Sequence, residues 1–168
     1  MIADSRTSVA FTGHRTYRGA AADALRRTVG ELYARGFRNF LSGMAVGFDL
    51  AAAEAVLELR ERAPGVRLVA AVPFRGQEMR FSPADRERFR RVLAAADHSV
   101  TLSPSYHAGC YAVRNNYLVE HAALLVAWYD GSPGGTHYTV RRALGRGLEF
   151  INLHPHPAAL RQAEPTLF

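Results

Sequence analysis

Short apolar or β-branched runs alternate with longer segments of helical periodicity along almost the whole chain. The runs predict strands at 8–12, 38–41, 66–72, 98–102, 123–129 and 149–153. The periodic segments predict helices at 20–35, 49–62, 83–96, 111–121 and 136–145. Parallel strands need crossover connections, and the connecting helices cover both faces of the sheet. The alternation therefore predicts a Rossmann-like three-layer α/β/α fold with a mostly parallel sheet.

The length of the chain fits a single domain. At 168 residues and 48% hydrophobic content, folding would remove roughly 70% of the unfolded surface from water. No internal repeat or low-complexity linker divides the sequence. We therefore expect one domain over 1–168, with a core at about 8–153 and a proline-containing C-terminal tail at 154–168.

Composition excludes several kinds of chemistry. The net charge of +6 comes from 21 basic residues, and all of them are arginine, so neither a Schiff-base lysine nor a P-loop lysine is available. One cysteine, Cys110, excludes a disulfide framework and a Cys-clustered zinc site. The seven histidines lack metal-binding spacings, so no metal site is expected. The arginine excess favours a phosphate-bearing ligand or nucleic acid, or else a solvated basic surface.

Hydropathy predicts a cytoplasmic protein with no membrane partner. No apolar run approaches the roughly 20 residues that cross a bilayer. The N-terminal residues also lack the charged-then-apolar order of a secretory signal.

Ligands of such sheets bind beyond the carboxyl ends of the strands, so the loops that follow the strands are the candidate site. After the first strand come Gly13, His14 and Arg15, where glycine permits close approach and arginine offers a planar fork to phosphate. After the second strand comes a turn with two glycines, which opens a helix and could hold an anion on its N–H groups. Its candidate residues are Ser42, Gly43, Met44, Gly47 and Asp49. Asp49 could cap the helix or accept ribose hydroxyls.

Two further loops complete the candidate set. Arg75 and Gln77 follow the third strand, where they either bind phosphate and base or ribose, or form an exposed polar loop. Arg114 and Asn115 lie in the helix that precedes the strongest predicted strand. A second glycine-rich turn follows that strand and builds another nest of N–H donors. Its candidate residues are Asp130, Gly131, Gly134, Gly135 and Thr136. Two such helix openings together favour a nucleotide-like phosphate ligand.

These motifs resemble the SLOG superfamily, whose Rossmann-like members include the LOG enzymes and DprA. The YpsA-like branch is most similar. Five motifs follow the family's order over about residues 8–153: Thr12-Gly13-His14-Arg15, Ser42-Gly43-x-x-x-Gly47-x-Asp49, Pro73-Phe74 with Gln77-Glu78, Arg114-Asn115, and Tyr129-Asp130-Gly131 with Gly134-Gly135-Thr136. The resemblance implies that a nucleotide or ADP-ribose-like ligand binds between the glycine-rich loops, with no certain cofactor.

Two other functions stay open, as does the question of turnover. LOG enzymes carry a catalytic glutamate after the second glycine-rich loop, but 132–139 has no carboxylate there. An N-glycosidic hydrolase would need a carboxylate from elsewhere, and the candidates are Asp49, Glu54, Glu120 and Asp130. DprA-like binding of single-stranded DNA would need a basic groove with stacking aromatics, and the sequence shows no such cluster.

The remaining expectations are structural. Cys110 and the hydroxyl of Ser42 lack the surroundings of a nucleophile, and Trp128 is expected in the core. Apolar positions around Tyr117 and Leu118 leave room for a homodimer.

Overall fold

One six-stranded sheet forms the centre of the molecule. The computed structural model describes residues 4–155, so the predicted tail beyond Pro155 lies outside the described residues. The strands are β1 (Ser8–Gly13), β2 (Asn39–Ser42), β3 (Arg67–Val72), β4 (His98–Thr101), β5 (Leu124–Trp128) and β6 (Glu149–Asn152). Their order is β4-β3-β2-β1-β5-β6, and every neighbouring pair is parallel. The predicted fold class is confirmed.

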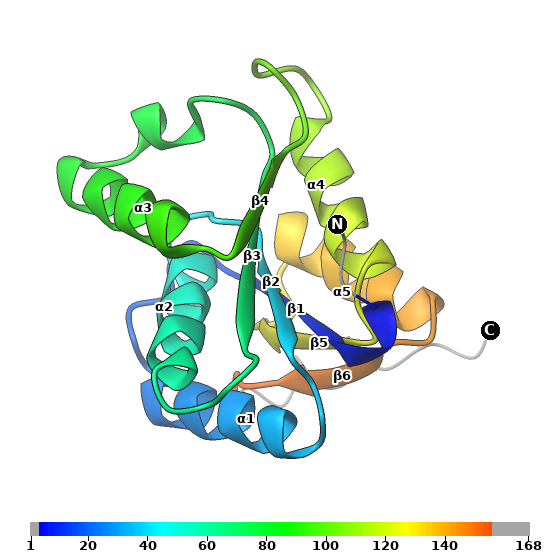
Figure 1. The fold of residues 1–168 in the computed structure, drawn as a ribbon. Coiled ribbons are helices and arrows are strands. Elements are labelled where there is room, and N and C mark those ends of the chain that lie inside the picture. Colours follow the sequence, from blue (N-terminus) through cyan, green and yellow to red (C-terminus); the bar gives the residue numbers. More distant parts are fainter. Residues whose placement is uncertain (1–3, 156–168) are drawn as a thin grey trace.

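Five helices cover the two faces of the sheet. They are α1 (Ala22–Ala34), α2 (Phe48–Arg60), α3 (Pro83–Ala95), α4 (Cys110–Glu120) and α5 (Gly135–Gly145). Figure 1 shows α1, α2 and α3 on one face and α4 and α5 on the other. Every predicted helix and strand begins and ends within two residues of the observed one. Two short 3-10 helices, η1 (Ser5–Thr7) and η2 (Gln77–Arg80), are additional.

The four inner strands are mostly apolar on both faces because helices cover both, whereas the edge strands β4 and β6 are more exposed. Successive side chains of β1 point to opposite sides. Val9 and Phe11 pack in the cluster beneath α1, α2 and α3, whereas Ala10 packs with Leu125 and Val140 beneath α4 and α5. Burial of each large apolar side chain stabilises the fold by about 1.5–3 kcal/mol. Both helical layers are thereby fixed against the strands whose ends carry the candidate loops.

The strand order reverses beside β1. The chain runs outward from β1 through β2 and β3 to β4, and then returns through α4 to β5 on the other side of β1. Gly13 is in register with Trp128, so the loops after β1 and β5 leave the sheet side by side. In open parallel sheets this is the place where a crevice forms for a ligand.

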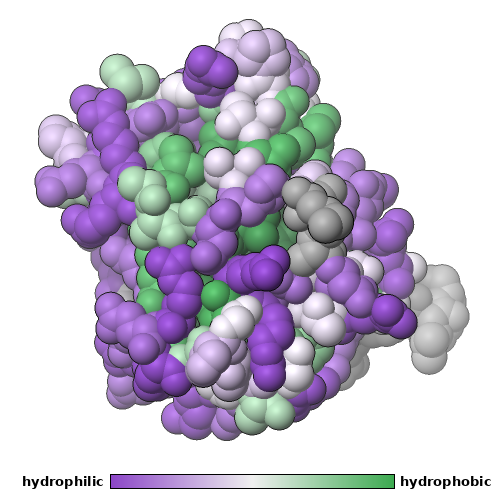
Figure 2. Space-filling model, viewed as in Figure 1, coloured by the Kyte–Doolittle hydropathy of each residue, from purple (hydrophilic) through white to green (hydrophobic). Residues whose placement is uncertain are grey.

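The visible surface is mainly hydrophilic, with hydrophobic residues showing mostly between α3 and α4 (Figure 2). Leu118 is buried in the core under α4, so it is not available to a partner chain. Tyr117 packs against the same core, and the large apolar side chains exposed among the described residues lie elsewhere: Met79, Tyr106, Val113 and Tyr138. Among the described residues, no helix is both long enough and apolar enough to cross a membrane.

Candidate functional site

A cavity of about 350 Å³ lies at the carboxyl edge of the sheet, where the strand order reverses. Its wall comes from four parts of the chain that are far apart in sequence. The lining residues are Thr12, Gly13, His14, Arg15, Ala45, Asp49, Tyr111, Arg114, Asn115, Gly135 and Thr136. The loop after β2 and the opening of α5 therefore meet at one cavity. We call it the switch-point cavity.

Arg114 is the buried cation of this cavity. Its side chain projects from α4, and the residue is only 5% exposed. Nε donates to Asn115 Oδ1 at 2.8 Å, and Nη1 donates to the carbonyl oxygen of Gly43. A Cβ atom on Gly43 would lie 2.7 Å from Nη1, so glycine is needed for this close approach. Burial lowers the pKa of Arg114, while the negative charge of Asp49 opposes that effect.

Asp49 is a buried carboxylate in the first turn of α2. Its Oδ2 accepts from the N–H of Ala45 at 3.4 Å, while Oδ1 has no hydrogen-bond partner among the described residues. Burial raises its pKa to about 6, although Arg114, the Ala45 N–H and Arg15 act in the opposite direction. The prediction that Asp49 could cap α2 is wrong, because the N-cap is Gly47 and the helix has no side-chain cap hydrogen bond. A ligand hydroxyl would satisfy the unpartnered oxygen.

Two helices open at this edge without side-chain caps. The N-cap of α2 is Gly47 and that of α5 is Gly134. The first N–H groups of a helix lack intrahelical partners and carry partial positive charge, so those of α5 suit an anion. In α2 the N–H groups of Phe48 and Leu50 already donate to the carbonyl oxygens of His14 and Ala45, at 3.4 and 3.2 Å. Gly47 has φ +84°, and a Cβ there would lie 2.6 Å from the carbonyl oxygen of Arg15. Position 47 therefore has no room for a residue larger than glycine.

His14 and Asp130 form the rim beside β5. His14 Nε2 lies 2.8 Å from Asp130 Oδ1 and 3.1 Å from the backbone nitrogen of Asp130. The hydroxyl and the N–H of Ser132 also bond to Oδ1. Hydrogen bonds from Ser132, helped by the charges of His14 and His154, lower the pKa of Asp130 to about 2. Asp130 is therefore ionised, and its carboxylate links Ser132, in the loop after β5, to His14. Asp130 does not line the switch-point cavity.

The other predicted site residues have different positions. Ser42 supports the loop from below, since its hydroxyl donates to the Asp49 carbonyl and accepts from the Met44 N–H. Met44 is buried with φ +64°, a strained conformation for a non-glycine residue. Gly131 and Gly134, both with positive φ, form the turn before α5. Arg75 is exposed, and Gln77 is buried with an amide that has no partner among residues 4–155. Neither of the last two lines the switch-point cavity.

Three lining residues, Thr12, Ala45 and Tyr111, are not among the predicted site residues, and Tyr111 is the largest of them. It lies three residues before Arg114 and so on the same face of α4, a spacing that could have identified it. The sequence shows no cluster of aromatic and basic residues, but the structure forms one from separate parts of the chain. Phe74, Tyr106 and Tyr111 are in ring contact, with arginines over them. Phe74 follows β3, Tyr106 lies in the loop after β4 and Tyr111 begins α4, and these segments meet because β3 and β4 end at the same edge.

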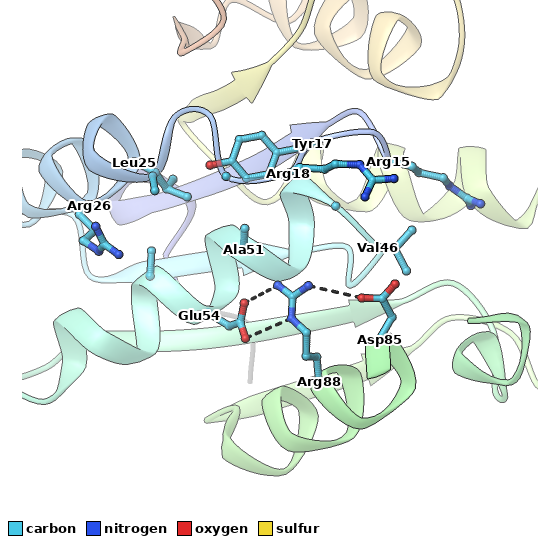
Figure 3. Close-up of a pocket in the computed structure, with 14 residues that line it drawn as sticks. Arg15, Tyr17, Arg18, Leu25, Arg26, Val46, Ala51, Glu54, Asp85 and Arg88 are labelled. Atoms are coloured by element: carbon cyan, nitrogen blue, oxygen red, sulfur yellow. Dashed lines mark hydrogen bonds and ion pairs between the residues drawn. The ribbon is translucent and has the colours of Figure 1, made fainter. Parts of the chain in front are cut away.

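A second cavity of about 530 Å³ lies between α1, α2 and α3. Arg15 lines both cavities, whereas the predicted site residue Gly47 lines the second one and not the switch-point cavity. Figure 3 shows Arg88 between Glu54 and Asp85, which bind its guanidinium. Arg26, also in the wall, is paired with Asp23 and Glu58. Two of the four arginines in this wall are therefore already paired with carboxylates, whereas Arg15 and Arg18 are in none of the ion pairs of the described residues. The switch-point cavity is favoured as the anion site because its own arginine, Arg114, is buried and held in a fixed orientation.

The four carboxylates that the sequence offers for catalysis have different surroundings in the structure. Glu54 is engaged by Arg88 in the second cavity, and Glu120 ends α4, 4.0 Å from Arg142. Asp130 is tied to Ser132. Of these four, only Asp49 lines the switch-point cavity. Among residues 4–155, no cluster of three or more histidine, cysteine, aspartate or glutamate side chains could hold a metal ion.

Comparison with known proteins places the chain in a family. The model of the YspA SLOG family, named YpsA, matches residues 10–147. The chain belongs to this family. A UPF0398 protein of Halalkalibacterium halodurans is 31% identical over 73% of the chain and 67% of its own length. An uncharacterized SPbeta prophage-derived protein of Bacillus subtilis, YoqJ, is 29% identical over 70% of the chain and 77% of its length.

Solved structures share the fold of this YpsA-family chain. DNA processing protein A from Streptococcus pneumoniae superposes with a TM-score of 0.63 at 18% identity, over 86% of the chain. The chain spans about half (49%) of that protein. The Helicobacter pylori protein of the same name, described as binding single-stranded DNA, gives 0.64 at 17% identity over 87% of the chain and 64% of its own. A molybdenum cofactor carrier protein from Chlamydomonas reinhardtii gives 0.54 at 16%, over 86% and 75%.

Proposed function

We propose that this YpsA-family protein binds the phosphate group of a nucleotide or nucleotide-derived ligand in the switch-point cavity. The observation that carries the proposal is the position of Arg114. Two of its nitrogens are anchored by protein oxygens, which fixes the guanidinium plane inside a cavity bordered by uncapped helix openings. A guanidinium has five N–H donors, and its planar fork matches phosphate geometry. The cavity thus presents a preorganised cation together with the first amides of α5 at Gly135 and Thr136.

The sugar of the ligand would lie against Asp49. Its Oδ1 is buried and lacks a donor, and the hydroxyls of a ribose can supply one. A nucleoside monophosphate or ADP-ribose brings a phosphate and a ribose diol together. The cavity volume is at the small end of the range for ligand pockets, about 300–1,000 Å³, so the base of such a ligand would extend past the rim.

Two alternative functions predict different experimental results. Adenine released from AMP by the wild type, and lost in Asp49→Asn, would indicate an N-glycosidic hydrolase with Asp49 as the acid or base. The fold neighbour described as binding single-stranded DNA supports the second alternative. In that case single-stranded DNA would bind with a steep dependence on salt and would not be displaced by AMP. Binding of AMP without turnover is the result that we expect.

Gly135→Ala should weaken binding of AMP and ADP-ribose at least about tenfold without unfolding the protein. A Cβ at position 135 would meet only Asn115 Nδ2, at 3.8 Å, so the fold tolerates it. The same methyl group would stand at the cavity wall, where phosphate must approach the first amides of α5. Isothermal titration calorimetry measures the affinities.

Gly145→Ala is the matched control, because it lies at the other end of α5 with no atom within 4 Å of the added Cβ. Its affinities should equal those of the wild type. Equal affinities in the wild type, Gly135→Ala and Gly145→Ala would contradict a phosphate position at the opening of α5.

A further inference from the structure

Beyond the cavity rim, three aromatic rings and two arginines form a continuous ledge. Tyr106 lies in the loop between β4 and α4, and Tyr111 lies in the first turn of α4. The ring centroids of Tyr106 and Tyr111 are 6.2 Å apart, and Phe74 contacts both at 5.5 and 5.9 Å. Figure 1 shows this loop projecting past the ends of the strands. We call Phe74, Arg80, Tyr106, Tyr111 and Arg15 the aromatic ledge.

The ledge is held in place from below. Phe74 is only 4% exposed and supports the two tyrosines edge-on. The N–H of Arg75 donates to the Ser103 carbonyl oxygen at 3.1 Å, and the Ser103 hydroxyl donates to the carbonyl oxygen of Ser105 at 2.7 Å. These bonds fix the loop after β4 against the loop after β3. Tyr106 nevertheless remains 49% exposed.

The arginines of the ledge carry charge that carboxylates do not compensate. Arg80 Cζ lies 4.5 Å from the ring centroid of Tyr106, and Arg15 Cζ lies 5.7 Å from that of Tyr111. Within the described part of the chain, neither arginine has a carboxylate within ion-pair distance. Aromatic rings with adjacent arginines are the surfaces on which nucleobases stack.

The ledge is continuous with the phosphate-binding cavity. Tyr111 and Arg15 belong to both, since each also lines the switch-point cavity. A ligand whose phosphate contacts Arg114 would therefore meet tyrosine rings as it leaves the cavity. We propose that the aromatic ledge is a nucleobase-stacking site, with Tyr106 as its exposed face. The inference rests on the proposed function and makes the ligand a nucleotide with an intact base, not a sugar phosphate.

The test compares AMP with ribose 5-phosphate, which lacks the base, by calorimetry on the full chain. Tyr106→Leu removes the ring but keeps an apolar side chain, and should weaken AMP binding about tenfold. Ribose 5-phosphate affinity should not change. Tyr106→Phe should retain AMP affinity. Tyr138→Leu is the matched control, because Tyr138 is 40% exposed on α5, outside the ledge, and it should bind AMP as the wild type does.

The outcomes distinguish failure of base stacking on the aromatic ledge from failure of phosphate binding in the switch-point cavity. Equal losses for AMP and ribose 5-phosphate, or no loss for AMP, would overturn the ledge while leaving phosphate binding intact. Failure of both compounds to bind the wild type would overturn the proposed function and the ledge with it. A short single-stranded oligodeoxyadenylate tests whether the stacked base belongs to a free nucleotide or to a DNA strand. Binding that is tighter than for AMP and equally sensitive to Tyr106→Leu supports stacking of a strand on the ledge.

Discussion

Asp49→Asn should raise the free energy of unfolding by roughly 3 kcal/mol at pH 7.5 and by less than about 1 kcal/mol at pH 4. Burial raises the pKa of Asp49 from 3.8 to about 6, so the folded state favours the protonated form. Well below pH 3.8 the group is protonated in both states and the substitution changes little. Between pH 3.8 and 6 the unfolded chain loses the proton while the folded protein keeps it, so the cost of burial grows, and above pH 6 it reaches its full value of roughly 3 kcal/mol. Asparagine has the same shape and carries no charge to bury.

Urea unfolding of the wild type and the variant from pH 4 to pH 8 measures this difference. Glu61→Gln is the matched control, since Glu61 is exposed at the end of α2 and its substitution should change stability by less than about 0.5 kcal/mol. A difference between Asp49→Asn and the wild type that does not vary with pH would rule out burial of the charge. The variant should also bind AMP more weakly, which would make Asp49 a residue retained for function at the expense of stability.

Arg114→Leu should abolish measurable AMP binding, a loss of at least about a hundredfold, because it removes the fixed cation of the cavity. It should also lower the free energy of unfolding by about 3–5 kcal/mol at pH 7.5, because Asp49 and the Gly43 carbonyl would stay buried without their partner. Calorimetry with AMP and urea unfolding measure the two effects.

Two further variants separate loss of binding from loss of folding. Arg114→Lys keeps the charge but not the planar fork, so it should stay folded and bind AMP weakly. Asp49→Asn combined with Arg114→Leu should recover most of the lost stability, because no unpaired charge remains. Arg142→Leu, a half-exposed arginine on α5, should bind AMP as the wild type does. Full AMP affinity in Arg114→Leu would contradict the assigned role.

The fold could be predicted from sequence because its signals are local. The four inner strands are largely buried and are marked mainly by apolar residues, while glycines and prolines mark the ends of many elements. The edge strands β4 and β6 are more exposed, and their sequence signals are weaker. The segment 77–80 was read as a loop, since one turn of 3-10 helix has too few residues to show a period. The prediction that Asp49 could cap α2 failed for a similar reason. The observed N-cap is Gly47, which adopts a positive φ and has no polar side chain that could indicate a cap in the sequence.

Much of the candidate site could be predicted from sequence, either from glycine-rich loops or, for Arg114 and Asn115, from a polar pair in a helix. The loops containing Gly13, Gly43 and Gly135 were identified because backbone approach demands glycine. The aromatic ledge could not be seen, because Phe74 and Tyr106 are distant in sequence and are brought together by the pairing of β3 with β4. The buried contact of Arg114 with Gly43 is likewise a product of tertiary structure.

Backbone and arginine side-chain NMR of the uniformly ¹⁵N-labelled protein during titration with AMP tests phosphate binding in the switch-point cavity most directly. We predict that the largest shift changes fall on the amides of Ala45, Gly135 and Thr136 and on the side-chain Nε–H of Arg114, all in that cavity. Shift changes confined to the second cavity, around Arg18, Arg26 and Arg88, or their absence throughout the protein at millimolar AMP, would contradict it.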